Sequence, residues 1–333
     1  MSRLFFIVLK LLLTLVILGA ATWGVGLLLF RLEGSVAIVA AVGFGIAALA
    51  GLVGLWTAAP RLPLGFAMVF VGLLSWWSTF QPSHDRDWIP ELARLPEITR
   101  EGDKITVTNL RNFRWRTESD YDQRWETRSF DLSKIEGADL FLSYWSGEAI
   151  AHLLVSFTFA DSPPLTFSIE VRRHKGQEWS ALAGFFRMYE MAYVAADERD
   201  IVGLRTNARG EDTRLFRLVA PPQQARNLLL AYAADVNLLA KQPRWYNTLT
   251  TNCTTVVFHL AGTVAPGALP LDPRVLLSGY LPGYLQRIGA VRTDIPLAEL
   301  VRLGRISEKA RTLSLDDPDF SKKIREGVPT RRP

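Results

Sequence analysis

The only cysteine in the 333-residue chain lies in a polar stretch that could make its thiol reactive. Of the nine residues from 247 to 255, all except Leu249 and Cys253 itself carry a side-chain hydroxyl or amide. Good helix N-cap residues, Asn252 among them, precede the cysteine, and apolar residues recur after it at helical spacing. The pattern predicts that Cys253 lies in the first turn of a short helix, where free amide groups and the helix dipole favour thiolate over thiol.

A lone cysteine is more often a small apolar residue of the core than a nucleophile. The polar surroundings of Cys253 are unusual for a core residue and favour the catalytic interpretation. The alternative is a packed thiol in a protein without catalytic activity.

A base for this thiol is predicted on a hairpin formed by residues 150–159 and 165–173, which alternate apolar and polar side chains around an Asp-Ser-Pro-Pro turn. The polar faces coincide when paired residue numbers add to an even value. In the register where paired residue numbers add to 324, His152 stands opposite Arg172, and Glu170 is the diagonal neighbour of His152. We therefore expect His152 to act as the base and Glu170 to orient it.

The other histidines fit the role less well. His84 falls in a polar linker, and His174 lies among basic residues. His259 follows Cys253 by six residues, so a helix places the two side chains on different faces. The run Asp-Glu-Arg-Asp at 197–200 could be a metal site or a carboxylate group, but its interleaved arginine favours a solvated ion-pair turn.

Three uncharged apolar runs, at 11–30, 36–59 and 64–80, account for the positive mean hydropathy of the chain. A bilayer core requires about 20 helical residues, so the third run is at the lower limit, and we predict three membrane spans. Arg3, Lys10 and Arg61 favour a cytoplasmic N-terminus, which places the rest of the chain outside the inner membrane.

The remaining composition excludes several function classes. One cysteine allows no intrachain disulfide and no zinc site built on paired thiolates. The extramembrane part holds 34 basic and 32 acidic residues, so we expect no nucleic-acid partner. We predict no metal and no cofactor. The locally basic end, 321–333, is expected to be a frayed tail.

We divide the chain into a three-helix anchor (1–80), a linker (81–101), a cysteine-dependent domain (102–265), and a covering segment with the basic tail (266–333). The fold class is α+β. The expected strands lie at 105–110, 113–116, 128–132, 139–145, 150–159, 165–173, 201–206 and 213–218, and the expected helices at 180–195, 221–239 and after Cys253.

Taken together, these motifs resemble the bacterial family of the Lnb N-terminal periplasmic domain, named for the lipoprotein N-acyltransferase Lnb. The resemblance rests on the His152 strand, on Ser-Ile-Glu-Val-Arg-Arg at 168–173, on the 197–200 run with Leu-Arg-Thr-Asn at 204–207, and on Tyr-Asn at 246–247 leading to Asn-Cys-Thr-Thr at 252–255. It implies a permuted relative of the papain-like NlpC/P60 class, with an antiparallel sheet and a cysteine-bearing helix.

The resemblance also implies a membrane-anchored acyltransferase with Cys253 as nucleophile and His152 as base. The expected substrates are a membrane phospholipid and the N-terminal amine of a lipoprotein. Residues expected to stabilise the oxyanion or position substrate are Asn252, Tyr246, Asn247, Thr254 and Arg172. The alternatives are a periplasmic cell-wall amidase or peptidase, and an envelope scaffold without activity.

Overall fold

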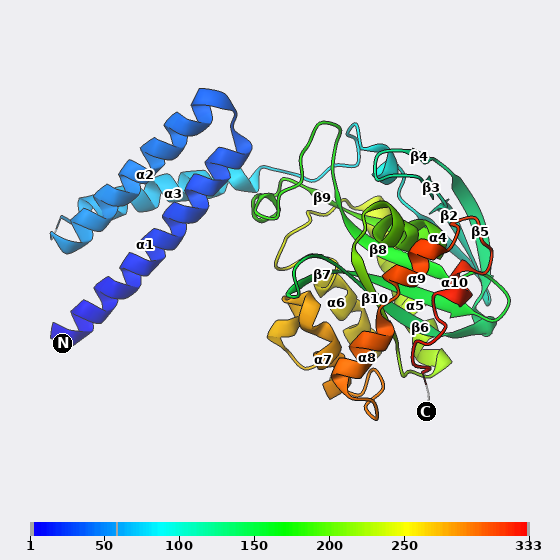
Figure 1. Ribbon diagram of the computed structural model, residues 1–333. Coiled ribbons are helices and arrows are strands. Elements are labelled where there is room, and N and C mark those ends of the chain that lie inside the picture. The colour runs from blue at the N-terminus through cyan, green and yellow to red at the C-terminus, as the bar shows by residue number, and fades with distance from the viewer. Residues whose placement is uncertain (1–2, 58, 332–333) are drawn as a thin grey trace. The chain divides into compact units, whose positions relative to one another are not determined.

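A computed structural model describes residues 3–57 and 59–331. The chain forms two compact units, and each is considered by itself. The first contains residues 1–84 together with residues 179–189. The second contains residues 85–178 and 190–333, and it holds the sheet that is drawn mainly in green in Figure 1.

The first unit is built on three apolar helices that are long enough to cross a membrane. They are α1 (Arg3–Arg31), α2 (Gly34–Trp56) and α3 (Arg61–Ser78). Their mean hydropathies of 2.7, 2.5 and 1.3 agree with the order of strength of the three apolar runs. Many large apolar side chains, such as Leu15 and Val39, face outward, as expected of helices surrounded by lipid rather than water.

Residues 179–189 form an irregular segment in this first unit, where the sequence predicted a helix over 180–195. A short 3-10 helix, η3 (Ala183–Phe186), is its one helical turn, and Phe186 stacks on Phe30 of α1 with ring centroids 5.2 Å apart. The prediction was wrong because aromatic residues that repeat at helical spacing are shared between this segment and a buried strand that begins at Glu190.

The second unit contains an eight-stranded sheet whose order is β1-β2-β9-β8-β7-β6-β10, with β5 paired to β2. Its neighbours are antiparallel except for a single parallel pair between β2 and β9. The strands are β1 (Glu97–Glu101), β2 (Lys104–Arg111), β5 (Trp125–Asp131), β6 (Ile135–Ser146), β7 (Ile150–Phe159), β8 (Leu165–Arg172), β9 (Glu190–Asp197) and β10 (Asp212–Arg217). A separate two-stranded sheet joins β3 (Arg114–Trp115) to β4 (Tyr121–Asp122).

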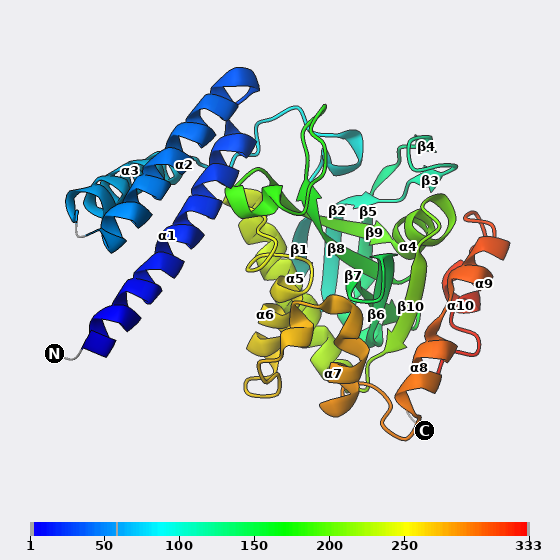
Figure 2. The same ribbon diagram turned by 60° about the vertical axis from the view of Figure 1, so that its left-hand side comes forward.

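Helices cover both faces of the large sheet, so two hydrophobic cores form (Figure 2). On one face lie α5 (Pro222–Lys241), α6 (Thr255–Val264) and α7 (Leu281–Arg287), and on the other α4 (Glu198–Gly203), α9 (Ser307–Thr312) and α10 (Phe320–Lys323). The remaining helix is α8 (Leu297–Gly304); the short 3-10 turns are η1 (Pro90–Leu92), η2 (Leu132–Lys134), η5 (Pro273–Val275) and η6 (Ser278–Tyr280). This two-layered covering gives a mixed α+β unit.

Most predicted strands are confirmed, and so is the helix after Pro221. Residues 201–206, predicted as a strand, instead form the end of α4 and a π-helical turn, η4 (Leu204–Ala208). The apolar residues Ile201 and Val202 that suggested a strand are buried in the core that the sheet forms with α9 and α10. Residues 97–101, placed in the linker by the sequence, form the edge strand β1.

The basic C-terminal segment is not frayed over its described residues. Arg325 donates to Asp139 at 2.9 Å and to Glu198 at 2.6 Å, and Arg331 also binds Asp139, at 2.7 Å. Both acidic side chains are fully buried. The two arginines therefore neutralise carboxylates that would otherwise be costly in the core.

Candidate active site

The sequence predicted Cys253 in the first turn of a helix, but it lies in the turn immediately before α6, two residues ahead of the first helical residue, Thr255. Asn252 organises this turn, because its Oδ1 accepts the backbone N–H groups of Thr254 and Thr255, both at 2.9 Å, while its Nδ2 donates to the Thr248 carbonyl at 2.7 Å. The side chain caps backbone amides at the helix start and fixes the backbone on both sides of the cysteine. The Cys253 thiol is partly buried.

The hairpin brings His152 and Glu170 together more directly than the sequence predicted. Paired residues of β7 and β8 add to 322 rather than 324, since Leu154 pairs with Ser168 and Phe157 with Leu165. This register places Glu170 opposite His152, just beyond the last recorded pair. The His152 Nε2 lies 3.2 Å from Glu170 Oε1 and 2.7 Å from Ser168 Oγ, and Ser168 donates to Glu170 at 2.6 Å.

Arg205 binds the same oxygen of the Glu170 carboxylate, Oε1, that His152 and Ser168 contact. Its guanidinium donates to Glu170 at 2.9 Å and to Glu211 at 3.4 Å, and its side chain is only 6% exposed. Glu211 in turn accepts a hydrogen bond from Ser143 on β6. Arg205 comes from the π-helical turn η4, a conformation often found where a helix must aim a functional side chain.

The electrostatics of the cluster favour an ion pair between sulfur and imidazole. Burial raises the pKa of Cys253, but His152, its hydrogen bond and the Leu153 N–H outweigh burial, so that pKa is lowered. Burial and the Arg205 cation lower the pKa of His152, but Glu170 and Cys253 raise it by more, so that this pKa is raised to about 9. The pKa of Glu170 lies well below its usual range, because His152 and Arg205 overcome the effect of burial.

The other residues predicted for the site differ in where they lie. The Thr254 hydroxyl is 3.9 Å from the sulfur. The pKa of Tyr246 is raised, first by burial and then by the charges of Cys253 and Glu170, which places its phenol in their field. Asn247 uses its Oδ1 to accept the N–H groups of residues 249 and 250 in its own turn. Arg172 donates to the carbonyls of residues 92 and 93 and is not brought to the cluster.

The acidic run at 197–200 is part of the structural framework of the sheet. Asp200 is fully buried and accepts both Arg111 and the Trp115 indole. Asp197 pairs with Arg128 and Arg199. The run is therefore an ion-pair turn as predicted, but a buried rather than a solvated one. Within residues 3–57 and 59–331, no group of three His, Cys, Asp or Glu side chains is arranged to hold a metal ion.

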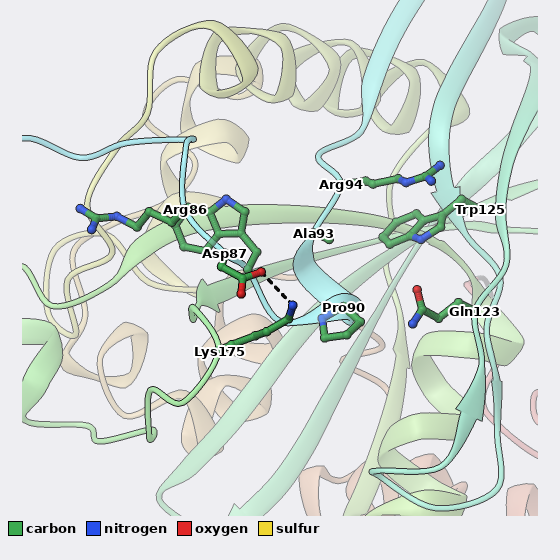
Figure 3. Close-up of a pocket in the computed structure, with 9 residues that line it drawn as sticks. Arg86, Asp87, Pro90, Ala93, Arg94, Gln123, Trp125 and Lys175 are labelled. Carbon is green, nitrogen blue, oxygen red and sulfur yellow. Dashed lines mark ion pairs between the residues drawn. The ribbon is translucent and has the colours of Figure 1, made fainter.

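An open pocket of about 450 Å³ lies elsewhere on the second unit (Figure 3). Lys175 pairs with Asp87 at 2.9 Å beside it, and Arg94 lies over the Trp125 ring. The pocket is lined by Arg86, Asp87, Trp88, Pro90, Ala93, Arg94, Gln123, Trp125 and Lys175. None of these residues belongs to the Cys253 cluster, and Lys175, the one lysine in the lining, is engaged by Asp87.

Sequence reasoning missed Ser168, Arg205 and the backbone N–H of Leu153. Ser168 could have been found, because it shares the polar face of its strand with Glu170. Arg205 belongs to the Leu-Arg-Thr-Asn motif at 204–207, but the sequence predicts a strand over 201–206. Its role depends on the π turn, which no spacing of side chains in the sequence indicates.

These observations define a class of protein: a membrane-associated chain whose α+β unit joins a cysteine, a histidine and a glutamate. Residues 121–279 match the family described as the Lnb N-terminal periplasmic domain, which is the family that the sequence resembled. The matched stretch includes Cys253, His152, Glu170 and Arg205, and it leaves out the three apolar helices. Searches of curated proteins and of solved structures found no significant match to the chain.

Proposed function

We propose that this protein is a cysteine-dependent acyltransferase that forms a thioester on Cys253. The observation that carries the proposal is the arrangement of Cys253, His152 and Glu170, in which the thiol pKa is lowered and the imidazole pKa is raised. A thiolate beside an imidazolium is the form in which a cysteine attacks a carbonyl carbon and a neighbouring acid protonates the leaving group.

In the first step the Cys253 thiolate attacks the ester carbonyl of a phospholipid. The carbon–sulfur bond forms, the carbon–oxygen bond breaks, and His152 gives its proton to the departing alcohol. Since Nε2 of His152 faces Ser168 and Glu170, Nδ1 is the nitrogen left for this transfer. Among the residues that the structure describes, the backbone N–H of Cys253 donates to no acceptor, and it is our choice for an oxyanion donor.

In the second step an amine attacks the thioester. Neutral His152 takes the proton of the amine, the amide bond forms, and the thiolate leaves. The N-terminal amine of a lipoprotein is the proposed acceptor, because both substrates then belong to the membrane that the three apolar helices would cross. The relation of the domain to the papain-like class remains a prediction.

Mass spectrometry of the purified full chain after incubation with phospholipid vesicles tests the proposal. We expect an adduct of fatty-acyl mass on Cys253, lost when a lipoprotein-like peptide amine is added and absent in Cys253→Ala. The thermal unfolding of the variant should match that of the parent. Muropeptide cleavage without an acyl adduct would instead identify a cell-wall amidase or peptidase, and neither activity would indicate a scaffold.

A further inference from the structure

Exposed apolar side chains cluster in one short segment of the second unit, residues 271–280, which contains the turns η5 and η6. We call Leu271, Leu276, Leu277 and Tyr280 the apolar lip. Leu271 is fully exposed, and the other three are 43–49% exposed. Other exposed apolar residues of this unit, such as Val219 and Leu238, occur singly along the chain. A cluster of this kind on an otherwise polar surface marks an interaction site.

The lip is fixed beside the strand that carries His152. Ser278 Oγ donates to the Ala151 carbonyl at 2.6 Å and accepts the Ala151 N–H at 2.9 Å. The Gly279 N–H donates to the Ala149 carbonyl at 3.0 Å, and the Tyr144 hydroxyl donates to the Gly279 carbonyl at 2.7 Å. A side chain at Gly279 would meet the Glu148 carbonyl oxygen at 2.0 Å, so only glycine permits this approach.

The charges around the lip suit a lipid headgroup region. Arg274 and Arg287 both bind Asp272, at 2.8 and 2.6 Å, which leaves one positive charge in excess. The Arg287 side chain is 52% exposed. Leucine and tyrosine side chains flanked by arginine are the composition of segments that lie in the membrane interface.

We infer that the apolar lip is a membrane-contact surface whose occupant is the phospholipid bilayer. The occupant is chosen because the same chain carries three helices long enough to cross a membrane, which keeps lipid at high effective concentration. Contact at the lip would hold the start of β7, and with it His152, close to lipid ester groups. The inference concerns binding and does not require chemistry at Cys253.

Cys253 is the single cysteine of the chain, so replacing it allows a label to be attached at one chosen position. In a full-length Cys253→Ser background, a thiol-linked environment-sensitive fluorophore is placed at Leu271→Cys, at Leu277→Cys and, as a matched exposed control, at Ser119→Cys. Each protein is reconstituted in vesicles with and without lipids that carry a spin label near the headgroup. We expect quenching several-fold stronger at positions 271 and 277 than at position 119.

Two outcomes of the quenching experiment overturn the inference. Equal quenching at all three positions would show that the lip has no special contact with lipid. A blue-shifted fluorescence at position 277 that the spin-labelled lipid does not quench, and that depends on the amount of protein per vesicle, would show that a second copy of the chain covers the lip. Because the Cys253→Ser background could alter folding, the unmodified full-length chain is also irradiated in vesicles containing diazirine-bearing phospholipid. Adducts should concentrate on peptides spanning 271–280, and their absence there would equally refute the contact.

Discussion

Cys253 and His152 ionise together rather than independently, and this coupling sets the chemistry of the site. Each group is partly withdrawn from water, which by itself favours the neutral forms. Their mutual attraction, together with the effect of the Glu170 charge on His152, reverses that preference for both. Arg205 acts in the opposite sense on His152, but it also keeps Glu170 ionised in a position where an unpaired carboxylate would be costly.

Replacing His152 by Ala should slow alkylation of Cys253 by iodoacetamide at pH 7. Without the imidazolium, burial dominates and the thiol pKa returns at least to its ordinary value of 9.0, at which about one per cent is ionised at pH 7. We therefore expect a fall of roughly 100-fold relative to a fully ionised thiolate. The comparison variant is His259→Ala, an exposed histidine on α6, and an equal loss in both variants would contradict the ion pair.

The pH dependence of thioester formation should show an alkaline limb near pH 9. Acylation requires protonated His152 to release the leaving group, and the pKa of His152 is raised to about 9, so activity is retained below that pH and declines above it. In Glu170→Gln the loss of the carboxylate charge should lower this pKa, and the limb should move to lower pH. Rates of acyl-adduct formation between pH 6 and pH 10 would show it. A limb at the same pH in both proteins would mean that Glu170 does not act on the imidazole.

At the scale of elements, the hairpin β7–β8 was predictable and the strand β9 was not. After its first residue, the residues of β7 alternate except at Leu154, because one face packs in an apolar core and the other carries the polar side chains of His152, Ser156 and Thr158. In β9 every residue is buried, with Met191 and Tyr193 in one core and Ala192 and Val194 in the other. A strand buried on both faces has no alternation, so its sequence also suits a buried helix.

The pairing register of the β7–β8 hairpin shows a second limit of sequence reasoning. The alternation of apolar and polar residues requires that the two residue numbers of each hairpin pair add to an even value, and both 322 and 324 satisfy that condition. The choice between them is made by the turn and by core packing, for example of Phe157 on Phe167. The site members Cys253, His152 and Glu170 could thus be named, while the direct opposition of His152 and Glu170 could not.

The turn before α6 should be sensitive to Asn252. Asn252→Ala removes the acceptor for the N–H groups of Thr254 and Thr255, and loss of such a cap costs about 1 kcal/mol. We expect a lower melting temperature together with slower alkylation of Cys253, because the sulfur is no longer held against His152. Asn252→Asp keeps the acceptor oxygen, so its melting temperature should stay closer to that of the parent. A normal alkylation rate in Asn252→Ala would show that the cap does not position the sulfur.

At the scale of the whole molecule, the proposed chemistry requires a particular membrane orientation. A lipoprotein amine is presented outside the cytoplasmic membrane, so the second unit must lie on that side. In this proposal three crossings would connect it to a cytoplasmic N-terminus, and the basic residues Arg3, Lys10 and Arg61 fall where the positive-inside rule places them for such a topology. The matched family, a periplasmic domain, is consistent with the same orientation.

Reporter fusions would establish this topology. Alkaline phosphatase, which folds only in an oxidising compartment, should be active when fused after the second unit and inactive when fused between α2 and α3. A green fluorescent reporter should give the reverse pattern. Changing Arg3 and Lys10 to Glu should weaken the preference, because these residues are the charged side chains ahead of the apolar run at 11–30. Phosphatase activity at the α2–α3 position but not after the second unit would invert the orientation and place Cys253 in the cytoplasm, away from the proposed acceptor.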